Sequence, residues 1–231
     1  MSWLAKMAGL AEVPVFVALG EDAPADAASI LAKTPGLRVV ETPRAAAILL
    51  AVGTIPKALI PQLHRLHDQL PHPRASALWH SRNELPGATR IEEIATISAF
   101  LSAIHRDLLA GNLKTEPDIL PDAPPNEWRG IGPHGQGGKG MMGGTPYGRA
   151  MAMTAADLRD GLELDAYTAD FGPFLPMLPP GLVLTLTLQG DMIQKVAVAH
   201  PPFETQEQRG WVLLNLLGLP ALAERMLRAT N

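Results

Sequence analysis

Short apolar runs alternate with longer amphipathic stretches through the first half of the chain, and this alternation restricts the possible folds more than any other feature. Three runs have the length and the branched composition of buried strands: Val13–Leu19, Leu37–Glu41 and Ala47–Val52. Leucine and isoleucine recur at helical spacing in two later stretches, at Leu59, Leu63, Leu66 and Leu70 and at Ile91, Ile94, Ile97, Leu101, Ile104 and Leu108. Strands that alternate with helices predict an α/β domain with a parallel sheet, which we place at residues 1–112.

Residues that favour helix starts precede the expected helices. Asp22 has the side chain of an N-cap, and Thr54 can cap the helix that carries the leucine stripe. Glu92 and Glu93 stand near the start of the isoleucine stripe, where carboxylates complement the positive end of a helix dipole. We therefore expect all four side chains to act locally, at helix N-termini.

Residues 113–150 have a different composition. Several prolines are followed by eight glycines between Gly130 and Gly144. Such a stretch cannot bury enough surface to offset the entropy lost on ordering, so it is predicted to be an extended linker. It also carries side chains that are typical of interfaces, and we expect it to order against a partner. The candidate interface residues are Trp128, His134, Met141, Met142 and Tyr147.

A hairpin pattern follows the linker. Leu182–Gln189 alternates apolar and polar residues, Gly190-Asp191 provides a turn, and Ile193–Ala199 supplies the returning strand. This alternation predicts two antiparallel strands with one buried face.

A helix is expected after the hairpin. Thr205 and Gln208 have the spacing of a capping box, while Gly218 and Pro220 are typical of a helix end. Together with the hairpin, this stretch predicts a small antiparallel β domain with a C-terminal helix over residues 151–231.

Composition argues against several classes of function. The net charge of −4 disfavours a nucleic-acid surface, because phosphate binding requires clustered Lys and Arg. The longest apolar run, at about residues 45–52, is far shorter than the roughly 20 residues of a membrane span, and we see no signal peptide. The absence of cysteine removes disulfides, thiolate zinc sites and thiol catalysis. We therefore expect a soluble cytoplasmic protein.

The glycine-rich stretch contains two G-x-G-x-x-G strings, Gly130–Gly135 and Gly135–Gly140. A dinucleotide fingerprint needs a strand before its turn and a helix after it, and neither pattern is present. A Walker loop also fails, since Pro133 occupies its first glycine position and Gly140 follows Lys139 where Ser or Thr is needed. Nucleotide binding is therefore not expected at this stretch.

Two groups of residues have metal-binding chemistry. The first, which suits copper(I), comprises His134, Met141, Met142, Met151 and Met153. The second, which suits zinc, comprises His64, His67, Asp68, His72 and His80. The first group falls in or beside the linker, and the helical members of the second are expected to face solvent or a partner. We assign no metal, no cofactor and no catalytic residue, because no nucleophile–base pair stands out either.

Residues 53–73 read GTIPKALIPQLHRLHDQLPHP. This segment resembles the corresponding stretch of the terminal cluster-bearing subunit of respiratory complex I, which is homologous to the small subunit of nickel–iron hydrogenases. The matching positions are Gly53, Thr54, Lys57, Pro61, Leu63, Arg65, Asp68, Gln69, Leu70, Pro71 and Pro73. The resemblance implies a flavodoxin-like sheet domain, in agreement with the alternation of strands and helices.

The same resemblance places the family's cluster cysteines in two segments of this chain. One is the loop Leu19–Asp22 after the first strand, and the other is the strand Ala75–Arg82. Cluster iron is held by thiolates, so a chain without cysteine cannot build that site. We expect the scaffold without the redox chemistry.

The loop before the hairpin carries Gly172, Pro173, Pro176 and Gly181. With the hairpin itself, these positions resemble the N-terminal β-sheet of complex I's quinone-site subunit, a relative of the hydrogenase large subunit. In that family a histidine lines the quinone headgroup pocket where this chain has Leu175, so quinone contact through this loop is not expected.

The two resemblances imply a non-catalytic structural or accessory subunit of a complex I-like or membrane-bound hydrogenase-like redox assembly. Its partners would be other subunits of that assembly, an NADH:quinone oxidoreductase- or hydrogenase-like complex. We expect it in the cytoplasm, or on the cytoplasmic face of the inner membrane through those partners. Two alternatives remain open: a stand-alone flavin- or nucleotide-binding flavodoxin-like oxidoreductase, and a metal-handling accessory protein that uses His134 and the methionines.

Overall fold

The computed structural model describes residues 11–24, 26–121, 153–156, 163–203, 213–214 and 217–229. They belong to two compact units. The first contains the described residues up to Leu120, residues 172–183 and the described residues from His200 onward. The second contains the described residues of the ranges 121–171 and 184–199.

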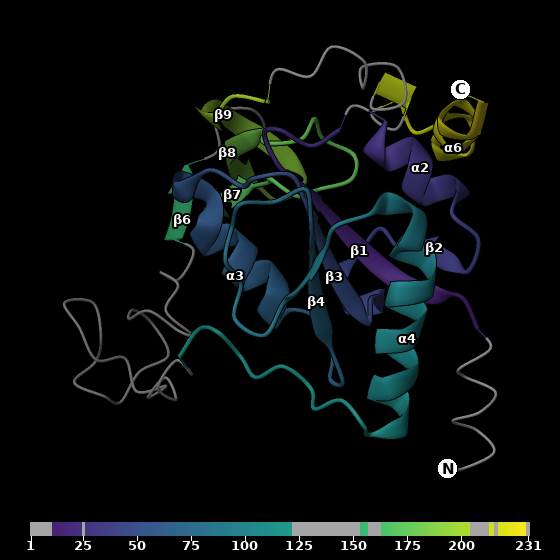
Figure 1. Ribbon diagram of the computed structural model, residues 1–231. Coiled ribbons are helices and arrows are strands. Elements are labelled where there is room, and N and C mark those ends of the chain that lie inside the picture. The colour runs from purple at the N-terminus through teal and green to yellow at the C-terminus, as the bar shows by residue number, and fades with distance from the viewer. Residues whose placement is uncertain are drawn as a thin grey trace. The chain divides into compact units, whose positions relative to one another are not determined.

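Five parallel strands form the sheet of the first unit (Figure 1). They are β1 (Val13–Leu19), β2 (Leu37–Val39), β3 (Ile48–Val52), β4 (Ala75–Trp79) and β5 (Thr89–Ile91). Their order is β2-β1-β3-β4-β5, and every neighbouring pair is parallel. This is the strand order of flavodoxin-like doubly wound sheets, so the predicted fold class is confirmed.

Different helices cover the two faces of this sheet (Figure 1). On one face, α2 (Ala27–Lys33) and α4 (Ile97–Ala110) share a buried apolar cluster with alternate residues of β1, β3 and β4. On the other face, α3 (Ile60–Asp68) and the short helix Lys57–Leu59 share a second cluster with the intervening strand residues. Neighbouring strand residues point to opposite faces, which is why Ile48 and Leu49 are both fully buried but lie in different clusters.

The start of α4 was predicted wrongly. The isoleucine stripe predicted a helix from about Ile91, but Ile91 ends β5, and α4 begins at Ile97 after a short 3-10 helix, Ile94–Thr96. Pairing of β5 with β4 fixes Ile91 in extended backbone, because Ile91 lies beside Trp79 in the sheet. Glu92 and Glu93 consequently lie before the helix, whose first turn contains no acidic residue.

The second unit is built on a four-stranded sheet of order β6-β7-β8-β9. Its strands are β6 (Met153–Ala156), β7 (Glu163–Phe171), β8 (Val183–Gln189) and β9 (Met192–His200). The predicted hairpin is present as β8 and β9, with Gly190 at the turn in the left-handed region at φ 60°. The buried face that was predicted for both strands is absent from β9, whose residues are exposed or half-buried along its whole length.

The compact units do not follow the contiguous division into residues 1–112, 113–150 and 151–231. Residues 172–183, which connect β7 to β8, group with the parallel sheet because Phe174 and Val183 pack into the second apolar cluster, on the α3 face of the sheet, which we call the α3-side cluster. The first residues of the expected linker also belong to the first unit, where Glu116 is buried. Residues 122–150, with all five candidate interface residues, lie outside the described part of the chain.

The C-terminal helix of the structure is α6 (Pro220–Ala229). Most of the helix expected from Thr205 lies outside the described residues, so that prediction stays open. Pro220 begins a helix instead of ending one, which its fixed φ and missing N–H favour at a first helical position. α6 packs on α2 and belongs to the first unit.

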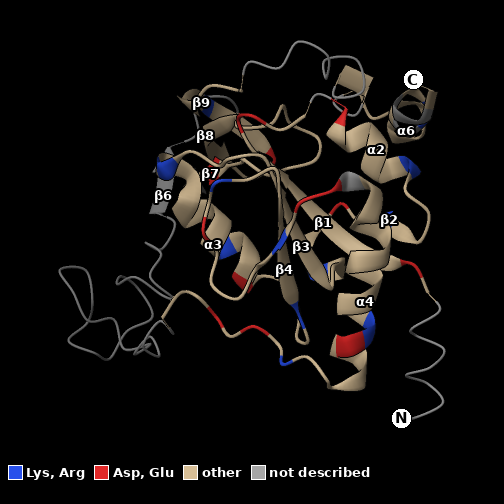
Figure 2. Cartoon of the chain, viewed as in Figure 1, with Lys and Arg blue, Asp and Glu red and all other residues tan. Residues whose placement is uncertain are grey.

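Within the described ranges, no helix combines the length and the apolar content that crossing a bilayer requires. Basic residues are spread over several elements and are not concentrated on one of them (Figure 2).

Candidate functional site

The carboxyl ends of the parallel strands are the expected location of a site in this fold. Doubly wound sheets bind ligands where neighbouring strands connect in opposite directions, which here is between β1 and β3. Three loops meet at this edge: residues 20–26 after β1, residues 53–56 after β3 and residues 80–88 after β4. The polar residues that join them are Asp22, Thr54, Arg82, Asn83 and Arg90, which we call the carboxyl-edge cluster.

The backbones of the first two loops touch. A Cβ atom added to Gly20 would lie 2.6 Å from the carbonyl oxygen of Thr54, and one added to Gly53 would lie 2.5 Å from the backbone nitrogen of Ala23. Gly53 also has a φ of +77°, which side chains rarely adopt. The backbone N–H of Glu21 donates to the Thr54 carbonyl at 2.9 Å. The crevice between β1 and β3 is therefore filled by the protein's own backbone.

Asp22 and Thr54 hold this contact together through their side chains. The Asp22 carboxylate accepts one hydrogen bond from the Thr54 backbone N–H and a second, at 3.0 Å, from the Thr54 hydroxyl. The same hydroxyl accepts a bond from the backbone N–H of Arg82 at 3.3 Å. Partial burial disfavours the charged carboxylate, but the hydrogen bonds from Thr54 outweigh it and lower the pKa of Asp22.

These bonds correct the prediction that Asp22 and Thr54 are helix caps. The N-cap of α2 is Asp26, and the short helix before α3 has Pro56 at that position. A capping side chain and a loop-joining side chain have the same chemistry, so the local sequence does not distinguish them.

The loop after β4 is fixed by two side chains that the sequence did not single out. The Asn83 amide accepts a hydrogen bond from the Ile55 N–H at 2.5 Å and donates to the Ile55 carbonyl at 2.8 Å. The Arg90 guanidinium donates to the carbonyls of Ser81 and Asn83 at 2.5 and 2.7 Å. This loop contains His80, at φ 52° the single non-glycine residue with a positive φ in the described part of the chain. A polar residue shortly after a buried strand was the signal that could have indicated Asn83.

A second polar group lies beneath α3. His67 was expected on the solvated side of the helix, but it is fully buried. Its Nδ1 lies 2.7 Å from the Asp68 carboxylate and its Nε2 lies 3.0 Å from the Glu116 carboxylate. Both ring nitrogens therefore face acceptors, which suits the doubly protonated ring. Burial alone disfavours that charged form, but the hydrogen bonds to Glu116 and Asp68 raise the pKa of His67.

The same group contains Arg74, whose side chain is buried. Its guanidinium donates to the Leu70 carbonyl at 3.1 Å, pairs with Asp118, and lies 3.6 Å from Asp68. Burial disfavours the Asp68 carboxylate, yet its pKa is lowered because the backbone N–H groups of Ile119 and Leu120 and the His67 ring bond to it. These contacts attach residues 115–120 to α3 and β4, so the group has a structural role.

The residues with zinc-binding chemistry do not converge. His67 and Asp68 meet, but His72 bonds the Thr115 hydroxyl at 2.7 Å and His80 lies in the loop after β4. Among the described residues, no group of three or more His, Asp or Glu is arranged to hold a metal ion. His134 and its neighbouring methionines, apart from the backbone of Met153, lie outside those residues.

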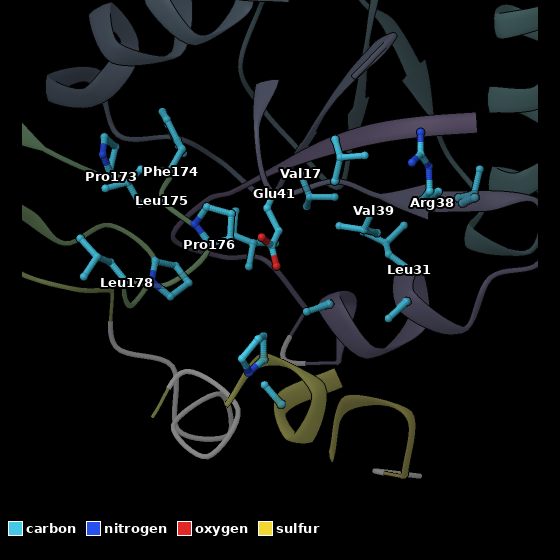
Figure 3. Close-up of a pocket in the computed structure, with 18 of the residues that line it drawn as sticks. Val17, Leu31, Arg38, Val39, Glu41, Pro173, Phe174, Leu175, Pro176 and Leu178 are labelled. Atoms are coloured by element: carbon cyan, nitrogen blue, oxygen red, sulfur yellow. The ribbon is translucent and has the colours of Figure 1, made fainter. Parts of the chain in front are cut away.

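The segment Gly172–Val183 forms the third feature of interest. Gly172 is at φ 108°, and a Cβ added there would lie 2.0 Å from the Leu182 carbonyl oxygen. The two ends of the segment are therefore in backbone contact, and its residues Phe174 and Val183 pack in the α3-side cluster. Leu175 lines a cavity of about 540 Å³ together with residues of α2, β2 and α6 (Figure 3).

The fold and the site together define a flavodoxin-like α/β domain in which side-chain hydrogen bonds close the usual ligand crevice. A small antiparallel sheet accompanies this domain. Comparisons with models of protein families, with curated proteins and with solved structures find no match to this chain.

Proposed function

We propose that this chain is a non-catalytic structural or accessory subunit of a complex I-like or membrane-bound hydrogenase-like redox assembly. The observation that carries the proposal is the position of the carboxyl-edge cluster. The two segments that resemble cluster-bearing segments, Leu19–Asp22 and Ala75–Arg82, meet at this edge, and the Thr54 hydroxyl bonds to both. Polar side chains connect the loops where the resembled family uses cysteines, which favours a scaffold that keeps the loop arrangement without the cluster.

The packing of Gly172–Val183 gives independent support. This segment resembles one subunit, while the domain on which it packs resembles the neighbouring subunit. Phe174 and Val183 share the α3-side cluster with Phe16 and Leu49. A contact of this kind within one chain is what a fused scaffold of the two neighbours would require.

Partners of the proposed scaffold would be the other subunits of the assembly. Large apolar side chains are exposed near the C-terminus and on β9, and such side chains are common at subunit interfaces. They are Leu213, Leu217, Leu219, Leu222, Met226, Val196 and Val198. The chain would then lie in the cytoplasm or, through these partners, on the cytoplasmic face of the inner membrane.

The flavin-binding alternative has one observation in its favour, the flavodoxin-like strand order. The close approach of the loops at Gly20 and Gly53 opposes it, because a cofactor at the β1–β3 crevice would have to separate backbones that are in contact. The visible spectrum of the purified chain separates the two functions. A flavin spectrum at one flavin per chain would support the alternative.

Deleting the gene tests the accessory role. We expect the amount of assembled redox complex on a native gel to fall, while iron and sulfide per assembled complex stay the same, because the chain contributes no cluster. Re-expression of the full chain should restore the amount. An unchanged amount of complex in the deletion strain would contradict the proposal.

A further inference from the structure

A cavity of about 540 Å³ lies beside β2, the edge strand of the parallel sheet. Its walls come from β1, α2, β2, the segment 172–183 and α6, which all belong to the first unit. No residue of the carboxyl-edge cluster lines it. It is therefore a separate feature from the crevice between β1 and β3.

The walls of this cavity are largely apolar. Leu31 and Leu37 contribute from α2 and β2, and Phe174, Leu175 and Leu178 contribute from the loop opposite (Figure 3). Small-molecule sites occupy about 300–1,000 Å³ and are lined mainly by apolar side chains with a few polar groups, so both size and lining are in the range of a ligand site.

One carboxylate projects into this apolar space. Figure 3 shows the side chain of Glu41 extending into the cavity between Pro176 and Val39. Within the described residues, this carboxylate makes no hydrogen bond and no ion pair. Glu12 also lines the cavity, and among the described lining residues Arg38 is the one basic side chain, so acidic side chains outnumber basic ones there.

We propose that this cavity binds an apolar small molecule with a cationic, hydrogen-bond-donating head, such as an alkylammonium compound. The apolar part would lie among Leu31, Leu37 and Leu175, where its burial is favourable. The head would donate to Glu41, which supplies a charge-assisted acceptor. This inference is independent of the proposed subunit role, because every residue involved belongs to the first unit of this chain.

The test uses the full chain and the neutral dye N-phenyl-1-naphthylamine, whose fluorescence rises in apolar surroundings. We expect saturable binding of the dye and its displacement by decylamine, decanol and decanoate, each below its micelle concentration. Decylamine, which is protonated at pH 7, should displace the dye at a concentration about tenfold lower than decanoate, because Glu41 accepts a charge-assisted hydrogen bond from the ammonium head and repels a carboxylate.

Substitutions that fill the cavity test whether the dye binds there. Ala32→Phe on α2 and Ala221→Phe on α6 each add a ring at the cavity wall. Once circular dichroism has shown that the variant is folded, either substitution should abolish dye binding. Ala99→Phe on α4 is the matched control and should bind the dye like the wild type. Glu41→Gln should keep dye binding and lose the preference for decylamine, whereas Glu93→Gln should retain it.

Two results would overturn the inference. Dye binding that survives in the folded filling variants would place the dye on another apolar surface, such as the exposed leucines near α6. An unchanged preference for decylamine in Glu41→Gln would remove the role of that carboxylate. Neither result bears on the subunit role, which is tested by the amount of the assembled redox complex.

Discussion

The carboxylate of Asp22 accepts two hydrogen bonds from Thr54, one from its backbone N–H and one from its hydroxyl, across 32 residues of sequence. Thr54 follows β3, and its hydroxyl also accepts the Arg82 N–H from the loop after β4. This pair thus joins three loops at the carboxyl edge of the sheet. We expect the arrangement of these three loops to depend on it.

Replacing Asp22 tests that dependence. Asp22→Ala is expected to lower the free energy of unfolding by about 1–3 kcal/mol, because the Thr54 N–H and hydroxyl lose a charged acceptor. Glu21→Ala is the matched control and should change stability by less than about 0.5 kcal/mol, since it removes a neighbouring exposed carboxylate. Urea unfolding midpoints measure both changes, and equal losses for the two variants would contradict the account.

The buried His67 gives a pH-dependent prediction. Its folded-state pKa is raised above the ordinary 6.5, so its contribution is fully present below about pH 6.5 and is lost as the pH rises through the higher folded-state value. The stability difference between the wild type and His67→Gln should therefore shrink as the pH is raised from about 6 to about 9. Urea unfolding at several pH values measures it.

His64→Gln is the control for this experiment, since His64 lies on the same helix and its replacement removes no bond of the buried group. A stability difference between the wild type and His67→Gln that stays constant from about pH 6 to about pH 9 would contradict the bonds assigned to His67.

Asp68 contributes at the acidic end of the pH range. Its pKa is lowered from 3.8, so its contribution to stability is present above that value and is lost as the pH falls through the lower folded-state value.

Arg74 is expected to be the most sensitive charged residue of the first unit. Arg74→Met should destabilise the fold by about 3 kcal/mol, because it leaves the Asp68 and Asp118 carboxylates without their buried basic partner. Arg65→Met, at an exposed position of the same helix, should change stability by less than about 0.5 kcal/mol. Thermal and urea denaturation compare the two. A larger loss for Arg65→Met would be incompatible with the burial of Arg74.

Two glycines with nearly the same φ separate the effect of backbone strain from the effect of close contact. Gly53 has φ +77° and is in contact with the Ala23 backbone, whereas Gly111 has φ +74° and open space around it. Gly111→Ala should cost about 1–2 kcal/mol, the strain of a left-handed alanine. Gly53→Ala should cost clearly more, because its Cβ also displaces the loop after β1. Similar unfolding midpoints for the two variants would show that the loops are not in contact.

The elements that could be predicted from the sequence are those with strong local patterns. β1 and β3 were recognised from runs of apolar, largely branched residues, and the leucine stripe of α3 is buried as its spacing predicted. β5 was missed because its three residues carry no periodic pattern and are held extended by pairing with Ala77 and Trp79 of β4. Short strands of this kind are determined by tertiary pairing.

The site was harder to predict because its residues act over long distances in sequence. Asp22 and Thr54 were both interpreted as caps, since an acceptor before a helix has the same local appearance whether it bonds the helix or a distant loop. His67 was interpreted as solvated because it lies beside the leucine stripe. Residues 115–120 return over that side of α3 and supply Glu116, a contact 49 residues away that no local pattern indicates.

We propose that this chain is a cluster-free subunit of a redox assembly. Affinity purification of the tagged full chain from its native cells, under conditions that preserve complexes, followed by identification and counting of the co-purifying subunits, tests it most directly. We expect cluster-bearing and quinone-site or nickel-site subunits in fixed stoichiometry with this chain, and no iron or acid-labile sulfide in the chain once it is separated from them. Purification of the chain without such subunits, or with stoichiometric iron and sulfide in the separated chain, would contradict it.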